Sequence, residues 1–151
     1  MPIPMKAEGA DTHDEAQIRQ LILDWIAAQC RKDIDGVMSH YAADVNVFSL
    51  TPPLLTQGAA SWRSVWEARL PHFPAGFHTE MRDLHILVSE TVAVAHWLFR
   101  FAGVRSDLPA VQSWFRITVG YEKRKGRWQI VHEHYSAPFD PATSQAVFTL
   151  D

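Results

Sequence analysis

The chain of 151 residues has little of several features that mark particular protein classes. Cys30 is its single cysteine, so no internal disulfide can form and nothing points to an oxidising compartment. The formal charge is -3, which gives no basic field for nucleic acid. No apolar run approaches the length that spans a membrane, and the first ten residues lack the apolar core of a signal peptide. We therefore expect a cytoplasmic protein that binds neither nucleic acid nor membrane.

What the chain does have is the composition of an ordinary globular protein. Hydrophobic residues make up 47% of it and charged residues 21%. The length suits one domain with a sizeable core. No internal repeat or low-complexity segment interrupts it. We expect a flexible lead-in over residues 1–12 and a single domain over residues 13–151.

The first half of the chain carries helical patterns. Apolar residues at helical spacing predict a helix over about 13–31. Asp33 can cap a second helix over 34–42. Gly58 precedes a third helix over about 59–70, which Pro71 ends. A short strand over 45–50 is expected between the second and third helices.

The second half carries strands. Four long candidates, joined by short polar links, favour antiparallel hairpins: 77–89, 92–104, 111–122 and 127–136. Helices followed by strands indicate an α+β fold. Long strands twist and curl, and a curled sheet with three N-terminal helices on its concave side forms a cone that encloses a cavity.

The closing segment over 128–138, W-Q-I-V-H-E-H-Y-S-A-P, is the most informative part of the chain. It alternates like a strand, in which neighbouring residues point to opposite faces. His132 and His134 therefore share one face, and Glu133 points to the other. Which face looks into the cavity decides much of the chemistry available to the protein.

These pieces together resemble the SnoaL-like, or ketosteroid isomerase-like, group of the nuclear transport factor 2-like superfamily. The resemblance rests on W-I-A-A at 25–28, D-I-D-G-V-M-S-H-Y-A-A-D at 33–44, Gly58 before the third helix, and the closing strand. That strand also resembles the end of the association domain of calmodulin-dependent kinase II. The resemblance implies a cystatin-like α+β cone with a mainly antiparallel sheet. It does not imply one function, because this fold supports both enzymes and assembly domains.

The isomerase chemistry implied by the family requires three residues, and this chain differs at each. In ketosteroid isomerase a carboxylate base moves the proton, while a tyrosine and a protonated aspartic acid donate to the enolate oxygen. The family's tyrosine corresponds to Trp25, its base to Ser49 and its aspartic acid, by an ungapped count, to Thr118. A serine is no unassisted base near neutral pH. Steroid isomerisation by that mechanism is therefore not expected.

Strand pairing gives an expected cavity. If the last hairpin turns around Arg124 and Lys125, then Arg116 lies opposite Glu133, and opposed residues share a face. A bulge would exchange the two faces. With the family count added, the expected pocket residues are Trp25, Ser49, Val65, Trp97, Phe99, Trp114, Thr118, Val131 and Tyr135, beside Arg116 and Glu133.

Two interpretations of Arg116 and Glu133 remain open: an acid/base pair or substrate grip, and a structural ion pair across two strands. His132 and His134, with His85 or His96, could in principle reach one metal, but hydrogen-bonded histidines at an interface are the simpler interpretation. We predict no metal and no cofactor. We expect a homodimer through an outer sheet face formed by Phe115, Ile117, Val119, Trp128 and Ile130.

Two functions follow from this sequence. The first is a pocket protein for a small, largely apolar or weakly acidic molecule, with isomerase-, cyclase- or dehydratase-type acid/base chemistry through Glu133 and Arg116 as an open question. The alternative is a non-catalytic binding or assembly module. An enzyme requires a ligand-sized space beside Glu133, whereas an assembly module requires a filled interior and a large apolar outer patch.

Overall fold

The computed structural model describes residues 11–104 and 109–150 and has an α+β fold built on one six-stranded sheet. The strand order is β2-β1-β6-β5-β4-β3, and all neighbours are antiparallel except β1 and β6, which are parallel. The expected α+β architecture with a mainly antiparallel sheet is confirmed. The strands are β1 (Tyr41–Phe48), β2 (Thr56–Gln57), β3 (His78–Val88), β4 (Val92–Ala102), β5 (Phe115–Arg124) and β6 (Arg127–Ser136), and a separate hairpin joins β7 (Phe139–Asp140) to β8 (Gln145–Ala146).

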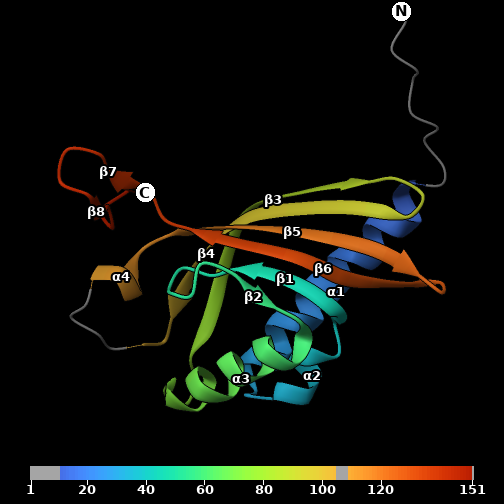
Figure 1. Ribbon diagram of the computed structural model, residues 1–151, viewed down its shortest axis with the longest axis horizontal. Helices are drawn as coiled ribbons and strands as arrows, with labels where there is room; N and C mark the ends of the chain where they lie inside the picture. Colours follow the sequence, from blue (N-terminus) through green and yellow to red (C-terminus); the bar gives the residue numbers. More distant parts are fainter. Residues whose placement is uncertain (1–10, 105–108, 151) are drawn as a thin grey trace, which may run out of the picture.

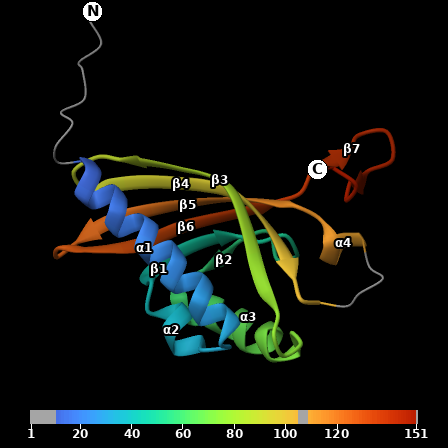
Figure 2. The same cartoon turned by 180° about the vertical axis from the view of Figure 1, so that it is seen from behind.

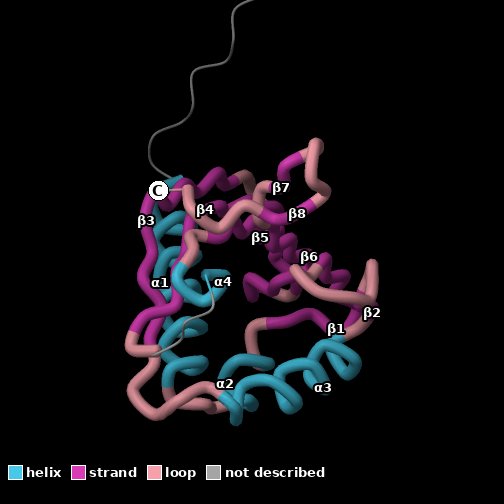
Figure 3. The backbone as a smooth tube through the Cα atoms, turned by 90° about the vertical axis from the view of Figure 1, so that its left-hand side faces the viewer, coloured by secondary structure: helices cyan, strands magenta, loops and turns pink. Residues whose placement is uncertain are grey.

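The helices lie on one side of this sheet. In Figures 1 and 2, α1 runs obliquely along the sheet, while α2 and α3 lie below β1. Figure 3 shows the sheet curling around the space that these helices close. The short α4 stands at the end where β4 runs toward β5. The helical elements are α1 (Asp11–Cys30), α2 (Ile34–Met38), α3 (Ala59–Arg69), the 3-10 helix η1 (Leu70–His72) and α4 (Pro109–Gln112).

Local signals set several of these boundaries. The Asp33 side chain accepts a hydrogen bond from the Gly36 amide and caps α2, as expected. Gly58 precedes α3 with φ 84°, a conformation that glycine adopts without steric cost. The second helix is shorter than predicted, because the chain is already extended at Tyr41, the first residue of β1. Val111 and Gln112, expected to begin a strand, lie in α4 instead, and residues 1–10 of the expected lead-in lie outside the described residues.

The last hairpin differs from the expected register. It turns at Lys125 and Gly126, both with positive φ, so that Arg124 lies opposite Arg127. Near the turn Tyr121 pairs with Ile130, but the next pair is Gly120 with His132. Val131 is left without a partner as the extra residue of a bulge. A bulge of one residue exchanges the faces on one strand relative to the other.

Because of this bulge, the residues of β5 and β6 that share a face differ from those expected. Arg116 pairs with Ser136 rather than Glu133, and Thr118 pairs with His134 rather than Val131. The set Phe115, Ile117, Val119, Trp128 and Ile130, expected on an outer dimer face, is instead buried in the core. The apolar outer face from which we argued for a dimer is therefore not formed by those residues.

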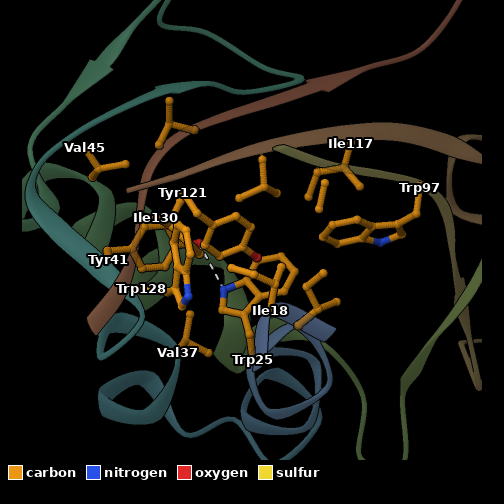
Figure 4. Packing of buried hydrophobic residues seen from close by; sticks show 14 of the residues in the cluster. Ile18, Trp25, Val37, Tyr41, Val45, Trp97, Ile117, Tyr121, Trp128 and Ile130 are labelled. Atoms are coloured by element: carbon orange, nitrogen blue, oxygen red, sulfur yellow. Dashed lines mark hydrogen bonds between the residues drawn. The ribbon is translucent and has the colours of Figure 1, made fainter. Parts of the chain in front are cut away.

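The core fills one end of the interior, which we call the packed end. Figure 4 shows Tyr121, Trp128 and Ile130 meeting Tyr41 and Val37 there. Asp14, near the start of α1, lies 3.1 Å from Lys123 Nζ and accepts a hydrogen bond from Trp128 Nε1. The helix is thereby tied to the hairpin at this end. We call the opposite end, beyond Trp25 and Trp97, the hollow end.

Candidate functional site

A cavity of about 300 Å³ occupies the hollow end, between the second half of α1, the α3–η1 segment and the inner face of the sheet. This volume is at the small end of the range for ligand pockets. Three indoles form its centre: Trp25 makes edge-to-face contacts with Trp66 and Trp97 at centroid distances of 6.2 and 6.3 Å. The rest of the wall is mostly apolar: Ile26, Leu50, Trp62, Val65, Leu70, Phe73, Phe77, Met81, Phe99, Phe101 and Ile117.

One side of the cavity wall is polar and basic. Arg69, in the last turn of α3, donates to Ser49 Oγ at 3.4 Å and to Thr51 Oγ1. All three residues line the cavity. Glu80 also lines it, but Arg100 Nε donates to its carboxylate at 2.9 Å. The cavity therefore has one arginine bound to neutral hydroxyls and one carboxylate already paired with an arginine.

Other polar groups of the wall have no hydrogen-bond partner within the described part of the chain. They include Gln29 Nε2, Trp66 Nε1 and Thr79 Oγ1. Gln29 is only 6% exposed, although it lies on α1 one turn after Trp25. Buried polar groups in folded proteins are normally hydrogen-bonded. Each of these three groups can donate a hydrogen bond, so the wall has donor capacity that the protein itself does not use.

Behind the aromatic wall lies a buried carboxylate. Glu133, on β6, is 0% exposed. Tyr41 donates to Glu133 Oε1 at 2.7 Å, and Tyr135 donates to Oε2 at 3.0 Å. Trp25 Nε1 in turn donates to the Tyr41 hydroxyl at 3.1 Å, the bond drawn in Figure 4. Both carboxylate oxygens thus have a partner, and none of the partners is a cation.

This environment favours the protonated form of the carboxyl group. Burial raises the pKa of Glu133 from 4.5 to about 7, against the lowering effect of the two tyrosine hydrogen bonds. Burial raises the pKa of Tyr41 and of Tyr135 well above 10, and the nearby Glu133 charge raises them further. Near neutral pH, Glu133 can therefore hold or release one proton, while the tyrosines keep theirs.

Glu133 has no direct access to the cavity. It is not among the lining residues, whereas its partner Tyr135 is. A bound molecule would meet the Tyr135 side chain first, and a proton could reach Glu133 only by way of that hydroxyl group. This arrangement differs from a carboxylate base that points directly at a substrate.

Several of the predicted pocket residues do meet around the cavity. Trp25 lines it from α1 and Val65 from α3, and Ser49 comes from the loop after β1. Trp97 and Phe99 line it from β4, and Tyr135 lines it from β6.

Four predicted residues lie elsewhere. Arg116 and Thr118 are exposed on the outer face of β5, where Arg116 Nε donates to Ser136 Oγ at 2.9 Å. Trp114 packs under the guanidinium groups of Arg82 and Arg100, at 4.3 and 4.7 Å from its ring centroid. Val131 is the unpaired residue of the bulge and does not line the cavity. The expected Arg116–Glu133 pair is therefore wrong, because the bulge puts the two side chains on opposite faces.

The histidines also lie on the outer face. His132 and His134 have ring centroids 6.5 Å apart, and His85 stacks on His96 at 5.1 Å. His132 Nδ1 lies 2.8 Å from the backbone carbonyl oxygen of Asn46, to which it donates. Across residues 11–104 and 109–150, no three His, Cys, Asp or Glu side chains are grouped closely enough to hold a metal ion.

Sequence reasoning missed several residues of the site, among them Tyr41, Arg69, Gln29 and Thr51. Tyr41 was expected inside a helix, so its contact with Glu133 could not be foreseen. Arg69 has a usable signal, because it follows Val65 and Trp66 at helical spacing on α3. Gln29 follows Trp25 by one turn in the same way. Thr51 lies in a loop, for which no periodicity applies.

Comparison with solved structures gives the same fold. An NTF2-like protein of unknown function from Pseudomonas putida KT2440 is 35% identical, with a TM-score of 0.85 over 93% of this chain and 97% of that chain. A protein of the NTF2-like family from Streptomyces avermitilis, described as a candidate dehydratase, is 13% identical with a TM-score of 0.74 over 87% and 100% of the two chains. A candidate ketosteroid isomerase from Shewanella frigidimarina is 18% identical with a TM-score of 0.65 over 78% and 92%.

No curated protein is similar enough to this chain to count as a match. None of the described helices is long and apolar enough to cross a membrane. The family model for the SnoaL-like domain, however, matches residues 18–140, a span that holds most of α1, the other helices, the six-stranded sheet and the whole described cavity wall. With its cystatin-like α+β fold and this match, the chain belongs to the SnoaL-like family.

Proposed function

We propose that the protein binds a small, largely apolar molecule in the cavity of the hollow end. The observation that carries the proposal is the aromatic cavity itself, which is open space lined by Trp25, Trp66 and Trp97 rather than by interlocking side chains. Protein interiors are normally packed without voids of this size. Largely apolar pockets with a few polar groups are typical of ligand sites.

A neutral aromatic probe tests this proposal. We expect 2-naphthamide to change the tryptophan fluorescence in a saturable way, because four indoles line the cavity. Val65→Phe should fill the space and weaken binding by at least about tenfold, a change worth ~1.4 kcal/mol. Val92→Phe is the matched control, since Val92 is 54% exposed and does not line the cavity. Binding that survives unchanged in Val65→Phe would contradict the proposal.

Acid/base turnover is a second candidate, favoured by the Glu133 carboxyl group with its raised pKa beside a tyrosine of the cavity wall. A substrate proton would pass to the Tyr135 hydroxyl as that hydroxyl gives its own proton to Glu133. The test is exchange of the acidic C–H protons of β-tetralone in heavy water, followed by NMR. Exchange above the buffer rate that disappears in Tyr135→Phe supports turnover, whereas exchange at the buffer rate leaves binding as the function.

Steroid isomerisation is not part of the proposal. Trp25 and Ser49 stand where that chemistry needs a tyrosine and a carboxylate base. The ungapped alignment placed the family's aspartic acid at Thr118, but Thr118 points outward. Its neighbour on β5 that points inward, Ile117, cannot replace that acid either. We expect an unsaturated ketosteroid to isomerise no faster with the protein than in buffer.

The non-catalytic assembly module is the weaker alternative. Such a module requires a filled interior, whereas Trp25 lines an open cavity. A homodimer through the outer sheet face remains a proposal on different residues from those first expected. Leu87 and Val94 form a cross-strand pair on that face and are 59% and 37% exposed, near the four histidines. Light scattering at micromolar concentration tests it, and a monomer would contradict it.

A further inference from the structure

Arg69 differs from Glu80, the other charged residue of the described cavity wall, in having no counter-ion. Within the described part of the chain, no carboxylate lies within ion-pair distance of its guanidinium group. By contrast Arg63, on the same helix, contacts both Asp35 and Glu67. Glu80, the one acidic residue that residues 11–104 and 109–150 contribute to the wall, is neutralised by Arg100. Among these residues, the net charge around the cavity is therefore positive and comes from Arg69.

The two partners of Arg69 increase its capacity to hold an anion. Ser49 Oγ and Thr51 Oγ1 accept hydrogen bonds from the guanidinium group. A hydroxyl group that accepts in this way keeps its own hydrogen free to donate. The guanidinium group has five N–H donors, so further donors remain after these two contacts. One side of the wall thus offers a set of donors and a positive charge.

Other polar groups of the cavity wall are also available as hydrogen-bond donors. Gln29 Nε2 and Trp66 Nε1 are buried donors without a partner, and the Thr79 hydroxyl is likewise unused. Gln29 is more than nine-tenths buried, so water does not readily satisfy its amide. A ligand that supplied acceptors would satisfy groups that the protein leaves unpaired. A ligand with several donors would leave these donors, and its own, without acceptors.

We infer that the ligand of this cavity is a small aromatic or alicyclic carboxylate whose carboxylate group is bound by Arg69, Ser49 and Thr51. The inference rests on the proposed binding function and names the chemical class of the ligand. The planar guanidinium fork matches a carboxylate, and hydrogen bonds to charged groups are the stronger kind. The aromatic wall around Trp25 and Trp97 takes the rings.

Two ligands with the same rings and different charge test the inference: 2-naphthoate, which is ionised at neutral pH, and 2-naphthamide, which is neutral. We expect the carboxylate to bind at least roughly tenfold more tightly by tryptophan fluorescence titration. Arg69→Gln should remove this preference while the amide binds as before. Arg69→Lys keeps the charge and should retain part of the preference, and added salt should reduce it because Arg69 is exposed.

Arg63→Gln is the matched control, because it removes the same charge from the same helix at a residue that does not line the cavity. It should leave the preference unchanged. Equal affinity for the two ligands in the native protein would overturn the inference and leave the apolar pocket standing. A preference that persists in Arg69→Gln would overturn the role of Arg69. If neither ligand binds, both the inference and the proposed function fail.

Discussion

The two ends of the interior are built on the same helix and the same sheet, yet one is solid and the other is hollow. At the packed end the α1 residues Ile18 and Ile22 are fully buried, in a core cluster that also holds aliphatic and aromatic side chains of β5 and β6. One turn further along α1, Ile26 lines the cavity and is only partly buried. The difference teaches that stability is concentrated at one end, which leaves the other free to hold a ligand.

Glu133 lies at the boundary between the two ends. Tyr41, one of its partners, is a core residue that does not line the cavity, and Tyr135, the other, is part of the cavity wall. A fully buried carboxyl group is costly to ionise. The buried network therefore connects the stability of the packed end with the protonation state of a group one hydroxyl away from the ligand.

The largest effect should come from truncating the same residue type at the two ends. Ile22→Ala should lower the free energy of unfolding by roughly 3–4 kcal/mol, because it leaves a cavity in a packed core. Ile26→Ala should cost only about 1–2 kcal/mol, since its side chain already borders open space. The change in helix propensity is the same for both. Urea denaturation measures the difference, and equal costs would mean that the hollow end is packed as tightly as the other.

A smaller effect should appear with pH at the boundary. The pKa of Glu133 in the folded protein, about 7, exceeds its ordinary value of 4.5. The folded state therefore binds the proton more tightly, and the contribution of Glu133 to stability is fully present below pH 4.5 and lost as the pH rises through 7. We expect the free energy of unfolding of the native protein to fall by roughly 3 kcal/mol between pH 5 and pH 8, relative to Glu133→Gln.

The Glu133→Gln reference is needed because His40 acts in the opposite direction. Burial lowers the pKa of His40, so its contribution to stability is lost as the pH falls. Both proteins contain His40, and the difference between them isolates Glu133. Parallel pH profiles for the two proteins would show that Glu133 is ionised as easily in the folded state as in the unfolded chain.

The smallest effect is expected on the outer face, where Arg116 was first expected to pair with Glu133. Arg116 is exposed and contacts Ser136, so Arg116→Ala should change the free energy of unfolding by less than about 0.5 kcal/mol. A double-mutant cycle with Glu133→Gln should give a coupling energy near zero. A coupling above ~1 kcal/mol would show that the two side chains interact despite the bulge.

Much of the fold was accessible from the sequence. Helical spacing, the Asp33 cap and Gly58 located the first and third helices and the start of the second, and alternation located β6 at its observed bounds, Arg127–Ser136. The part of the site on α1 and β4 followed from the family resemblance, which gave Trp25, Trp97 and Phe99. These signals are local or nearly so, and local geometry fixes which residues share a face within one element.

The sequence by itself determined that His132 and His134 share a face opposite to Glu133, because that follows from the pleat of a single strand. Only the tertiary structure decided what lies opposite Glu133 on β5. The answer depended on the turn at Lys125 and Gly126 and on the bulge at Val131. A bulge is a property of two paired strands, set by how their side chains pack against the helices, and alternation within either strand alone does not reveal it. The same packing brought Tyr41 to Glu133 across a sequence separation of 92 residues.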